Sequence, residues 1–152
     1  MDITYKVNLK SVINVMIEYY KNHKLKKLSS CRIINIASIY GVVSPEFSIY
    51  GKKDRFSSEI YGATKAGLIQ LTKYYSILFA KYNILVNCIS PGGIENQKIQ
   101  SVKFRKKYIS RVPLKRMAKV EDLYTAVLFL SSKNTKYVTG QNLIIDGGLT
   151  VK

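Results

Sequence analysis

Two short stretches of the chain are apolar on both faces, and this pattern restricts the possible folds. The stretches RIINIA (residues 32–37) and ILVNCI (residues 84–89) place apolar residues at successive positions, so both faces of an extended chain are apolar. Strands of this kind are typical of parallel sheets that helices cover on both sides. A third stretch, QNLIID (residues 141–146), stands before two glycines and predicts one more strand.

Between these strands the apolar residues recur at helical spacing. The pattern predicts a helix over residues 5–20, ended by the basic stretch KNHKLKK, and another over residues 61–80. The apolar stripe of the second helix contains Leu68, Leu71, Tyr75 and Leu78. A shorter helix over residues 121–130 has acidic residues in its first turn. Strands that alternate with helices predict an α/β fold with a parallel sheet, and without a repeat or clear linker we expect one domain over residues 1–152.

The chain is strongly basic, with 25 Lys and Arg against 9 Asp and Glu and a formal charge of +16. That excess suits phosphates, anionic cofactors, acidic partners or nucleic acid, and does not choose among them. No apolar run reaches the roughly 18 residues of a membrane span, and the N-terminus lacks the form of a signal peptide. We therefore expect a cytoplasmic protein without a membrane partner.

Cysteine and histidine are scarce. Cys31 and Cys88 lie beside or inside apolar runs, which predicts buried free thiols. The single histidine, His23, lies in a Lys-rich stretch and is expected to face solvent. Because no Cys/His cluster is present, we expect no metal site.

The stretch YGATK (residues 61–65) contains two side chains that can take part in acid–base chemistry. Positions i and i+4 of a helix share a face, so Tyr61 and Lys65 are expected to point the same way. A nearby positive charge favours phenolate over phenol, which suits a tyrosine for proton exchange near neutral pH. Ser38 directly follows the first predicted strand, at the edge where open α/β sheets place ligands. Taken alone, the same spacing is also that of an amphipathic surface helix.

Several other stretches accompany the YGATK motif, and together they resemble the short-chain dehydrogenase/reductase family. The matching stretches are VNL (7–9), RIINIASIYG (32–41), YGATKAG (61–67), ILVNCISPGGI (84–94), VPLKRM (112–117), VEDLYTAVLFLSS (120–132) and VTGQNLIIDGG (138–148). The resemblance implies a Rossmann-type parallel sheet. It also implies hydride transfer between NAD or NADP and a small carbonyl or alcohol substrate.

The resemblance also implies roles for single residues. Tyr61 would be the proton donor and acceptor, and Lys65 would favour its phenolate form and bind the nicotinamide ribose. Ser38 would hold the substrate oxygen, and Asn8 would complete the group by supporting a proton relay through water. Further cofactor contacts are implied for Pro91, Gly92, Ile94 and Asn96. Asn96 stands where many members have a threonine near the cofactor phosphates, so a hydroxyl contact is in doubt there.

A second departure is the insertion PEFSIYGKKDRFSSEI between Ser38 and Tyr61. It should enlarge one wall of the substrate pocket, and Phe47, Tyr50 and Arg55 suit a hydroxylated substrate such as a sugar derivative. The combination of ASIYG, this insertion and SPGGI resembles members associated with flagellin and surface-sugar modification. The alternative is a surface loop without a role in specificity.

The family binds its dinucleotide mainly through a glycine-rich turn in its first half. No glycine precedes Gly41, so residues 1–40 cannot form that turn. We therefore expect a C-terminal portion of a doubly wound fold that lacks the first βαβ units and binds NAD(P) weakly or not at all. The first strand would then be an open apolar edge.

Other functions remain open. Residues 98–119 contain nine Lys and Arg and no acidic residue, which suits either a mobile lid that attracts acidic substrates or a nucleic-acid surface. We favour the lid, because VPLKRM matches the family there and no nucleic-acid module is present. A non-catalytic fragment or interaction subunit is a third possibility. Family resemblance and the apolar stripes of the two long helices predict a homo-oligomer.

Overall fold

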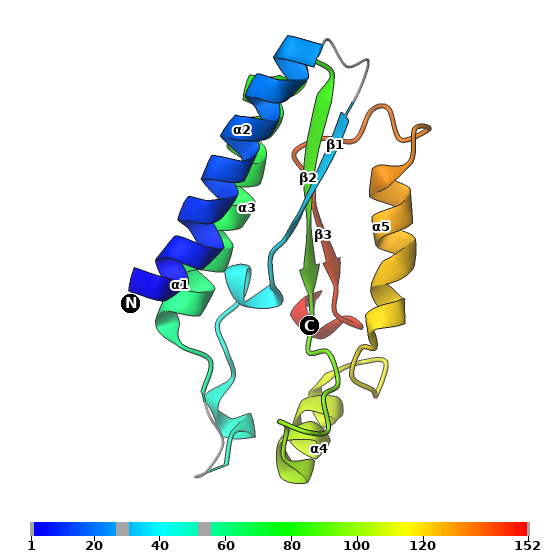
Figure 1. Ribbon diagram of the computed structural model, residues 1–152. Coiled ribbons are helices and arrows are strands. Elements are labelled where there is room, and N and C mark those ends of the chain that lie inside the picture. The colour runs from blue at the N-terminus through cyan, green and yellow to red at the C-terminus, as the bar shows by residue number, and fades with distance from the viewer. Residues whose placement is uncertain (1, 27–30, 52–55, 152) are drawn as a thin grey trace.

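The computed structural model describes residues 2–26, 31–51 and 56–151. Within these ranges the centre of the protein is a three-stranded parallel sheet with the order β1-β2-β3 (Figure 1). The strands are β1 (Cys31–Ile36), β2 (Ile84–Pro91) and β3 (Asn142–Ile145). The helices α2 (Ser11–Lys26) and α3 (Glu59–Ala80) lie on one side of the sheet, and α5 (Tyr124–Ser131) lies on the other. The predicted α/β fold with a parallel sheet is confirmed.

The side chains of β2 explain why the sheet needs helices on both faces. Successive residues of a strand point to opposite faces. Ile84 and Val86 pack against Met16 of α2 and Phe79 of α3. On the other face, Ile89 packs against α5 in a cluster that includes Ala126 and Leu130. Both sets of side chains are therefore removed from water, as the apolar runs of the sequence predict.

The register places the carboxyl ends of all three strands at one edge of the sheet. β1 and β2 pair from Cys31 opposite Ile84 to Ile36 opposite Ile89. β2 and β3 pair from Cys88 opposite Asn142 to Pro91 opposite Ile145. We call this edge the carboxyl edge and the opposite one, where β1 and β2 begin, the amino edge. The loops that follow the strands, including Ser38, Gly92 and Asp146, meet at the carboxyl edge.

The first predicted helix has a more complex form. It is built from α1 (Asp2–Tyr5), a π-helical turn η1 (Lys6–Lys10) and α2, which continues to Lys26 rather than ending at residue 20. The predicted helix over residues 61–80 is present as α3, beginning at Glu59. One stripe position is wrong, because Leu78 is 44% exposed and the adjacent Phe79, 1% exposed, faces the core instead.

The rest of the chain differs from the prediction mainly in one helix. α4 (Val102–Arg111) lies in the basic segment, where no helix was expected. Its apolar stripe is short and interrupted by Lys and Arg, but Ser101 marks its start, since the Ser101 hydroxyl accepts a hydrogen bond from the Phe104 N–H at 3.1 Å. The short 3₁₀ turns are η2 (Ile39–Gly41), η3 (Phe47–Ile49), η4 (Val120–Leu123) and η5 (Leu149–Val151).

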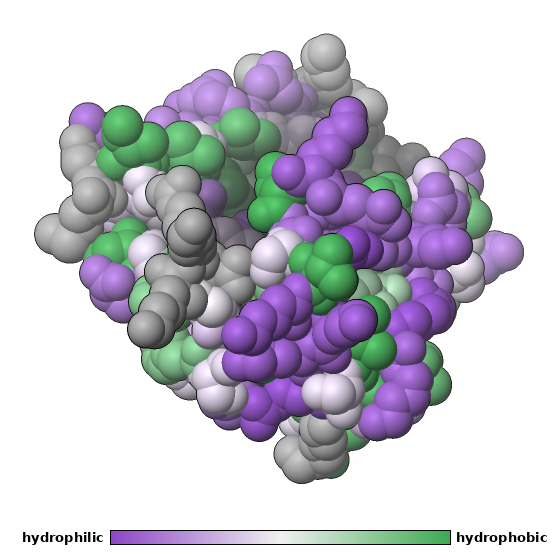
Figure 2. Space-filling view, turned by 90° about the horizontal axis from the view of Figure 1, so that it is seen from below, coloured by the Kyte–Doolittle hydropathy of each residue, from purple (hydrophilic) through white to green (hydrophobic). Residues whose placement is uncertain are grey.

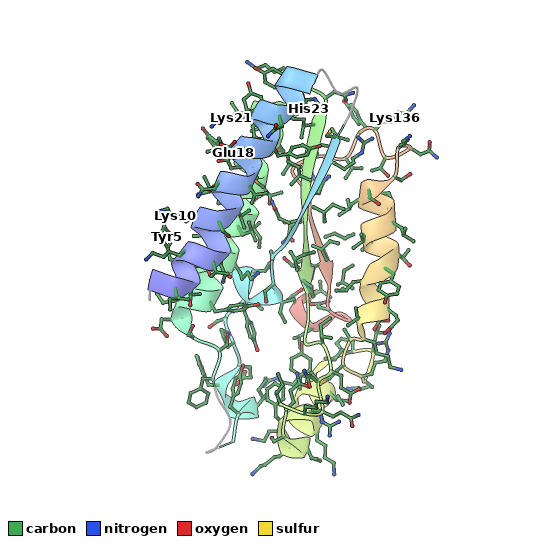
Figure 3. All side chains as sticks on the ribbon, in the orientation of Figure 1. Tyr5, Lys10, Glu18, Lys21, His23 and Lys136 are labelled. Carbon is green, nitrogen blue, oxygen red and sulfur yellow. The ribbon has the colours of Figure 1, made fainter. Side chains whose placement is uncertain are left out.

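The expectation that His23 faces solvent is wrong. Its side chain is 4% exposed and lies at the amino edge, on the inner side of the last part of α2 (Figure 3). The cause is the length of α2, which extends past residue 20 and holds His23 against the start of β1. Cys88 is buried and Cys31 half-buried, and both are free thiols, as predicted. Among the described helices, none combines the length and the apolar character that crossing a membrane requires.

Candidate active site

Ser38 lies at the carboxyl edge, immediately beyond β1. The Ala37 N–H still donates to the Ile89 carbonyl at 2.8 Å, which keeps the chain beside β2 until Ser38. Ser38 is 8% exposed and has an extended backbone, and it begins η2. Its hydroxyl accepts a hydrogen bond from the Tyr40 N–H at 3.2 Å. The end of β1 and this capping contact together fix the position of the Ser38 oxygen.

Two glycines allow η2 to pack directly on the first turns of α3. A Cβ atom at Gly41 would lie 2.7 Å from the carbonyl carbon of Lys65, and one at Gly62 would lie 3.0 Å from the Tyr40 carbonyl oxygen. Side chains at these positions would therefore push the two segments apart. This packing brings the Ser38 loop to the part of α3 that carries Tyr61 and Lys65. This role of Gly41 was not predictable from the sequence, because its contact is with a residue 24 positions away.

Tyr61 and Lys65 share one face of α3, as predicted from their spacing. The Lys65 Nζ atom lies 5.6 Å from the centroid of the Tyr61 ring, within the range of a cation–π contact. The same ammonium donates to the carbonyl of Ile36, the last residue of β1, at 2.8 Å. Burial lowers the pKa of Lys65. The ammonium therefore links the tyrosine ring to the end of the strand that precedes Ser38.

Asn8 is connected to the same turn through a residue that the sequence analysis missed. The Asn8 side-chain amide donates to the Thr64 hydroxyl at 3.0 Å, and that hydroxyl donates to the Tyr61 carbonyl at 2.9 Å. Thr64 is 4% exposed. Asn8 lies within the π-helical turn η1, a type of irregularity that is frequent at functional sites. The YGATK motif contains Thr64, but its spacing alone gave no reason to expect a partner from residues so distant in sequence.

A groove of about 500 Å³ opens beside these residues, between α2 and β1. Asn8 and Lys65 line it together with apolar side chains such as Val12, Ile34 and Leu68. As far as the described residues extend, β1 is the outer strand of the sheet here, and Ile36 is 49% exposed. The groove therefore combines an ammonium and an amide at one end with a largely apolar wall.

The other predicted cofactor residues lie around a different cavity or in turns. Pro91 ends β2, and Gly92 lines a cavity of about 180 Å³ with Tyr108, Arg116 and Asp146, without Asn8 or Lys65. Ile94 forms an isolated β-bridge with Ala118. The exposed Asn96 accepts a hydrogen bond from the Lys98 N–H at 3.1 Å in a local turn. The structure thus links Asn8, Tyr61 and Lys65 through contacts on the first turns of α3, and the loop that begins with Ser38 packs on the same turns. The Pro91–Asn96 segment follows β2 separately.

The insertion after Ser38 forms part of two further cavities. One, of about 750 Å³, is lined by Tyr40, Phe47 and Gly62, among others. The Tyr40 and Tyr50 hydroxyls lie 3.1 Å apart, and burial, with this hydrogen bond, raises the pKa of Tyr40 far above its ordinary value. The Tyr40 phenol therefore remains a neutral hydrogen-bonding group. Arg55 lies outside the described residues.

The basic segment packs on this insertion. Arg111 pairs with Glu46 at 3.0 Å, the Lys107 ammonium donates to the Ser48 carbonyl at 2.6 Å, and Arg105 pairs with Glu95 at 2.9 Å. Figure 2, which views the molecule from the end that carries α4, shows hydrophilic side chains gathered across this face. At least three of the basic side chains of α4 are thus engaged with neighbouring segments of the same chain.

Comparisons with known proteins show which family the chain resembles. A family model described as enoyl-(acyl carrier protein) reductase matches residues 1–150. The chain is 38% identical to the 3-oxoacyl-(acyl-carrier-protein) reductase FabG of Thermotoga maritima over 154 residues, which cover 99% of this chain and 57% of that protein. This chain thus spans a little over half the length of the relatives that it matches.

Two solved structures have the same arrangement of elements. A short chain dehydrogenase from Leptospira borgpetersenii, solved with bound NAD+, is 44% identical with a TM-score of 0.88, over 96% of this chain and 54% of that one. A gluconate 5-dehydrogenase from Burkholderia cenocepacia, in complex with NADP and tartrate, is 30% identical with a TM-score of 0.83, over 97% of this chain and 55% of that one.

Proposed function

Because the chain belongs to the short-chain dehydrogenase/reductase family, we propose that it supplies the proton-transfer site of an NAD(P)-dependent oxidoreductase. The reaction would interconvert a carbonyl compound and the corresponding alcohol. The observation that carries this proposal is the Lys65 ammonium, 5.6 Å from the centroid of the Tyr61 ring beside the loop that begins with Ser38.

The residues present fit the nicotinamide end of such a cofactor. The ammonium of Lys65 has three donors, and the Ile36 carbonyl takes one of them, which leaves donors for ribose hydroxyls. The groove of about 500 Å³ beside it offers an apolar wall and the Asn8 amide. When bound there, NAD or NADP would supply or accept the hydride.

The proposed roles of the side chains follow from their positions. The Tyr61 hydroxyl would give a proton to the substrate oxygen during reduction and take it back during oxidation. Lys65 would stabilise the phenolate electrostatically. Ser38 Oγ would hold the substrate oxygen by a hydrogen bond. Asn8 would support proton transfer to solvent, and its bond to Thr64 would fix the turn that carries Tyr61.

For the substrate we propose a small hydroxylated compound, such as a sugar derivative. The cavity of about 750 Å³ beside the insertion supports this, because it is roomy and is lined by Tyr40 and Ser44 among its polar groups. Tyr108 and Arg111 of the basic segment line the adjacent cavity of about 260 Å³ together with Tyr40 and Ser44, which supports a role for this segment as a wall beside the pocket. The gluconate 5-dehydrogenase comparison is consistent with such a substrate class.

We also propose that copies of this chain associate through the outer faces of α2 and α3. Ile17 on α2 is 37% exposed, and Tyr74 and Ile77 on α3 are 59% and 80% exposed. Large apolar side chains grouped on adjacent helices favour association. Light scattering after size-exclusion chromatography tests this: Ile77→Asp should shift the protein to the monomer, and Val120→Asp, exposed away from these helices, should not.

The proposed activity is tested by assaying the protein with NAD+ and NADP+ against a panel of sugar alcohols and simple secondary alcohols. At high cofactor concentration, which offsets the weak binding expected without the glycine-rich turn, reduced cofactor should appear with the wild type and be lost in Tyr61→Phe. Persistent activity in that variant would refute the proposed role of Tyr61. Association through α2 and α3 without any turnover would instead support the interaction-subunit function.

A further inference from the structure

A second group of reactive side chains lies at the amino edge, away from Ser38 and Tyr61. His23 in the last part of α2 contacts two segments that begin strands: its Nδ1 lies 3.1 Å from Cys31 Sγ, and its Nε2 lies 3.0 Å from the Tyr82 carbonyl oxygen. Figure 3 labels His23 at the end of α2, near the starts of β1 and β2. Tyr19, one turn earlier on α2, hydrogen-bonds Cys31 through its side chain.

The Tyr82 contact determines where the imidazole carries its proton. A carbonyl oxygen only accepts hydrogen bonds, so the Nε2 atom must be the donor in that contact. In the neutral ring, Nδ1 is then the unprotonated nitrogen. It faces the Cys31 sulfur at 3.1 Å and is placed to accept a hydrogen bond from the thiol. Cys31 is thus placed as a nucleophile, His23 is the base beside it, and the Tyr82 carbonyl orients that base.

Two surrounding features stabilise the pair after the proton has moved. The Tyr19 hydroxyl can donate to a thiolate, and burial together with the hydrogen bond to Cys31 raises the pKa of Tyr19 to about 12, which keeps this donor protonated. His23 lies near the C-terminal end of α2, where the helix carbonyls favour a cation. The imidazolium and the thiolate each therefore have a stabilising neighbour.

The other cysteine lacks this environment. Cys88 is 0% exposed in the middle of β2, and its thiol donates to the Asn142 side-chain oxygen at 3.3 Å. Burial raises the pKa of Cys88 and so keeps it a neutral thiol. Cys31 is partly exposed at the start of β1. The two cysteines thus form a natural comparison between an activated thiol and an inert one.

We propose that Cys31 is a nucleophilic thiol activated by His23, and that peroxides oxidise it selectively to a sulfenic acid. The Cys31 sulfur would attack one oxygen of hydrogen peroxide, forming an S–O bond as the O–O bond breaks. Sulfur loses two electrons and the peroxide gains them. The departing hydroxide takes the proton held on His23 Nδ1 and leaves as water, so the products are Cys31 sulfenic acid and water.

The first test measures alkylation of the whole chain by iodoacetamide near neutral pH, followed for each cysteine by mass spectrometry. Cys31 in the folded protein should react about tenfold faster than Cys31 in the same protein unfolded in urea, since most free thiols are protonated at this pH. Cys88 should remain unmodified until the protein unfolds. A folded-state rate for Cys31 at or below its unfolded rate would overturn the proposal, and this arm needs no variant.

The second test separates activation from accessibility. In His23→Gln, whose amide can still donate to the Tyr82 carbonyl, the Cys31 rate should fall about tenfold while circular dichroism and the melting temperature confirm folding. Tyr19→Phe should lower the rate less. After brief exposure to hydrogen peroxide, dimedone should label Cys31 in the wild type and not in Cys31→Ser. An unchanged alkylation rate in folded His23→Gln, or no dimedone adduct on Cys31, would contradict the proposal.

Discussion

The two edges of the sheet each hold a pair of groups suited to proton exchange, but they assemble the pair differently. At the carboxyl edge, Tyr61 and Lys65 lie one turn apart on α3, with the ammonium 5.6 Å from the ring centroid. At the amino edge, His23 and Cys31 come from α2 and β1 and meet at 3.1 Å. The Tyr61–Lys65 pair requires only that α3 is helical. The His23–Cys31 pair requires in addition that α2 packs on the sheet, so it depends on tertiary structure.

The largest expected effect tests the chemistry of the carboxyl edge. Tyr61→Phe removes the proposed proton carrier and leaves the ring beside Lys65, so we expect turnover to fall by about 10²–10⁴-fold with little change in the melting temperature. Tyr74→Phe is the matched control, because Tyr74 lies on the same helix and is 59% exposed. Equal turnover in the two variants would contradict the proposed role of Tyr61 as the proton carrier of the carboxyl edge.

The next effect tests how closely the Ser38 loop must pack on α3. Gly41→Ala places a Cβ 2.7 Å from the Lys65 carbonyl carbon, and neither backbone can move easily. We expect the free energy of unfolding to fall by about 3 kcal/mol in urea titrations. Gly67→Ala is the control, since its Cβ meets only the Leu9 side chain at 3.3 Å and alanine favours a helix. A smaller loss at Gly41 than at Gly67 would contradict the close backbone contact.

At the amino edge, His23→Leu should lower the free energy of unfolding by about 2 kcal/mol, because the hydrogen bonds of the imidazole to the Tyr82 carbonyl and to Cys31 are both lost. Any turnover at the carboxyl edge should be unchanged at temperatures where the variant is folded, since the sites share no partners. Lys21→Ala on the same helix removes only an exposed pair with Glu18 and should cost little. Loss of turnover in folded His23→Leu would show that the edges are coupled.

A smaller effect concerns the link between Asn8 and α3. In a double-mutant cycle, Asn8→Ala and Thr64→Val should show a coupling of about 1 kcal/mol in the free energy of unfolding. Each substitution alone removes the same hydrogen bond between the two side chains, so their effects are not additive. Asn8→Ala combined with Thr72→Val should show none, since the Thr72 hydroxyl accepts from Asn35 instead. Equal coupling in both cycles would mean that the Asn8 contact contributes nothing specific.

The smallest effect is a pH dependence. Burial lowers the pKa of Lys65, so the folded protein loses this proton at a lower pH than the unfolded chain, in which lysine titrates near about 10.4. Between the two values the unfolded state binds more protons, and the free energy of unfolding therefore rises with pH. Solvent screening should keep this rise below about 1 kcal/mol. We expect the free energy of unfolding, measured by urea titration at several pH values, to rise with pH in the wild type and not in Lys65→Met. The difference should be confined to this pH range. The same pH dependence in both proteins would refute the prediction.

Most of the fold was predictable because it depends on local pattern. The doubly apolar runs predicted β1 and β2, and the helical spacing predicted α3 and the common face of Tyr61 and Lys65. Helix α4 was missed because Lys and Arg interrupt its apolar stripe, although Ser101 gave a start signal. Leu78 was assigned to the core in place of Phe79, because a stripe defined by spacing alone does not fix which of two neighbouring positions faces the sheet.

The parallel α/β arrangement and the Tyr61–Lys65 pair could be predicted from the amino-acid sequence, because alternation along a strand and the turn of a helix are local properties of the backbone. Three features could not: Thr64 receives the Asn8 amide, Gly41 and Gly62 let the Ser38 loop approach α3, and His23 is buried against Cys31. Each of these depends on which residues far apart in the chain meet when apolar faces leave water. No local spacing encodes that meeting, because it is set by the packing of the whole sheet with its helices.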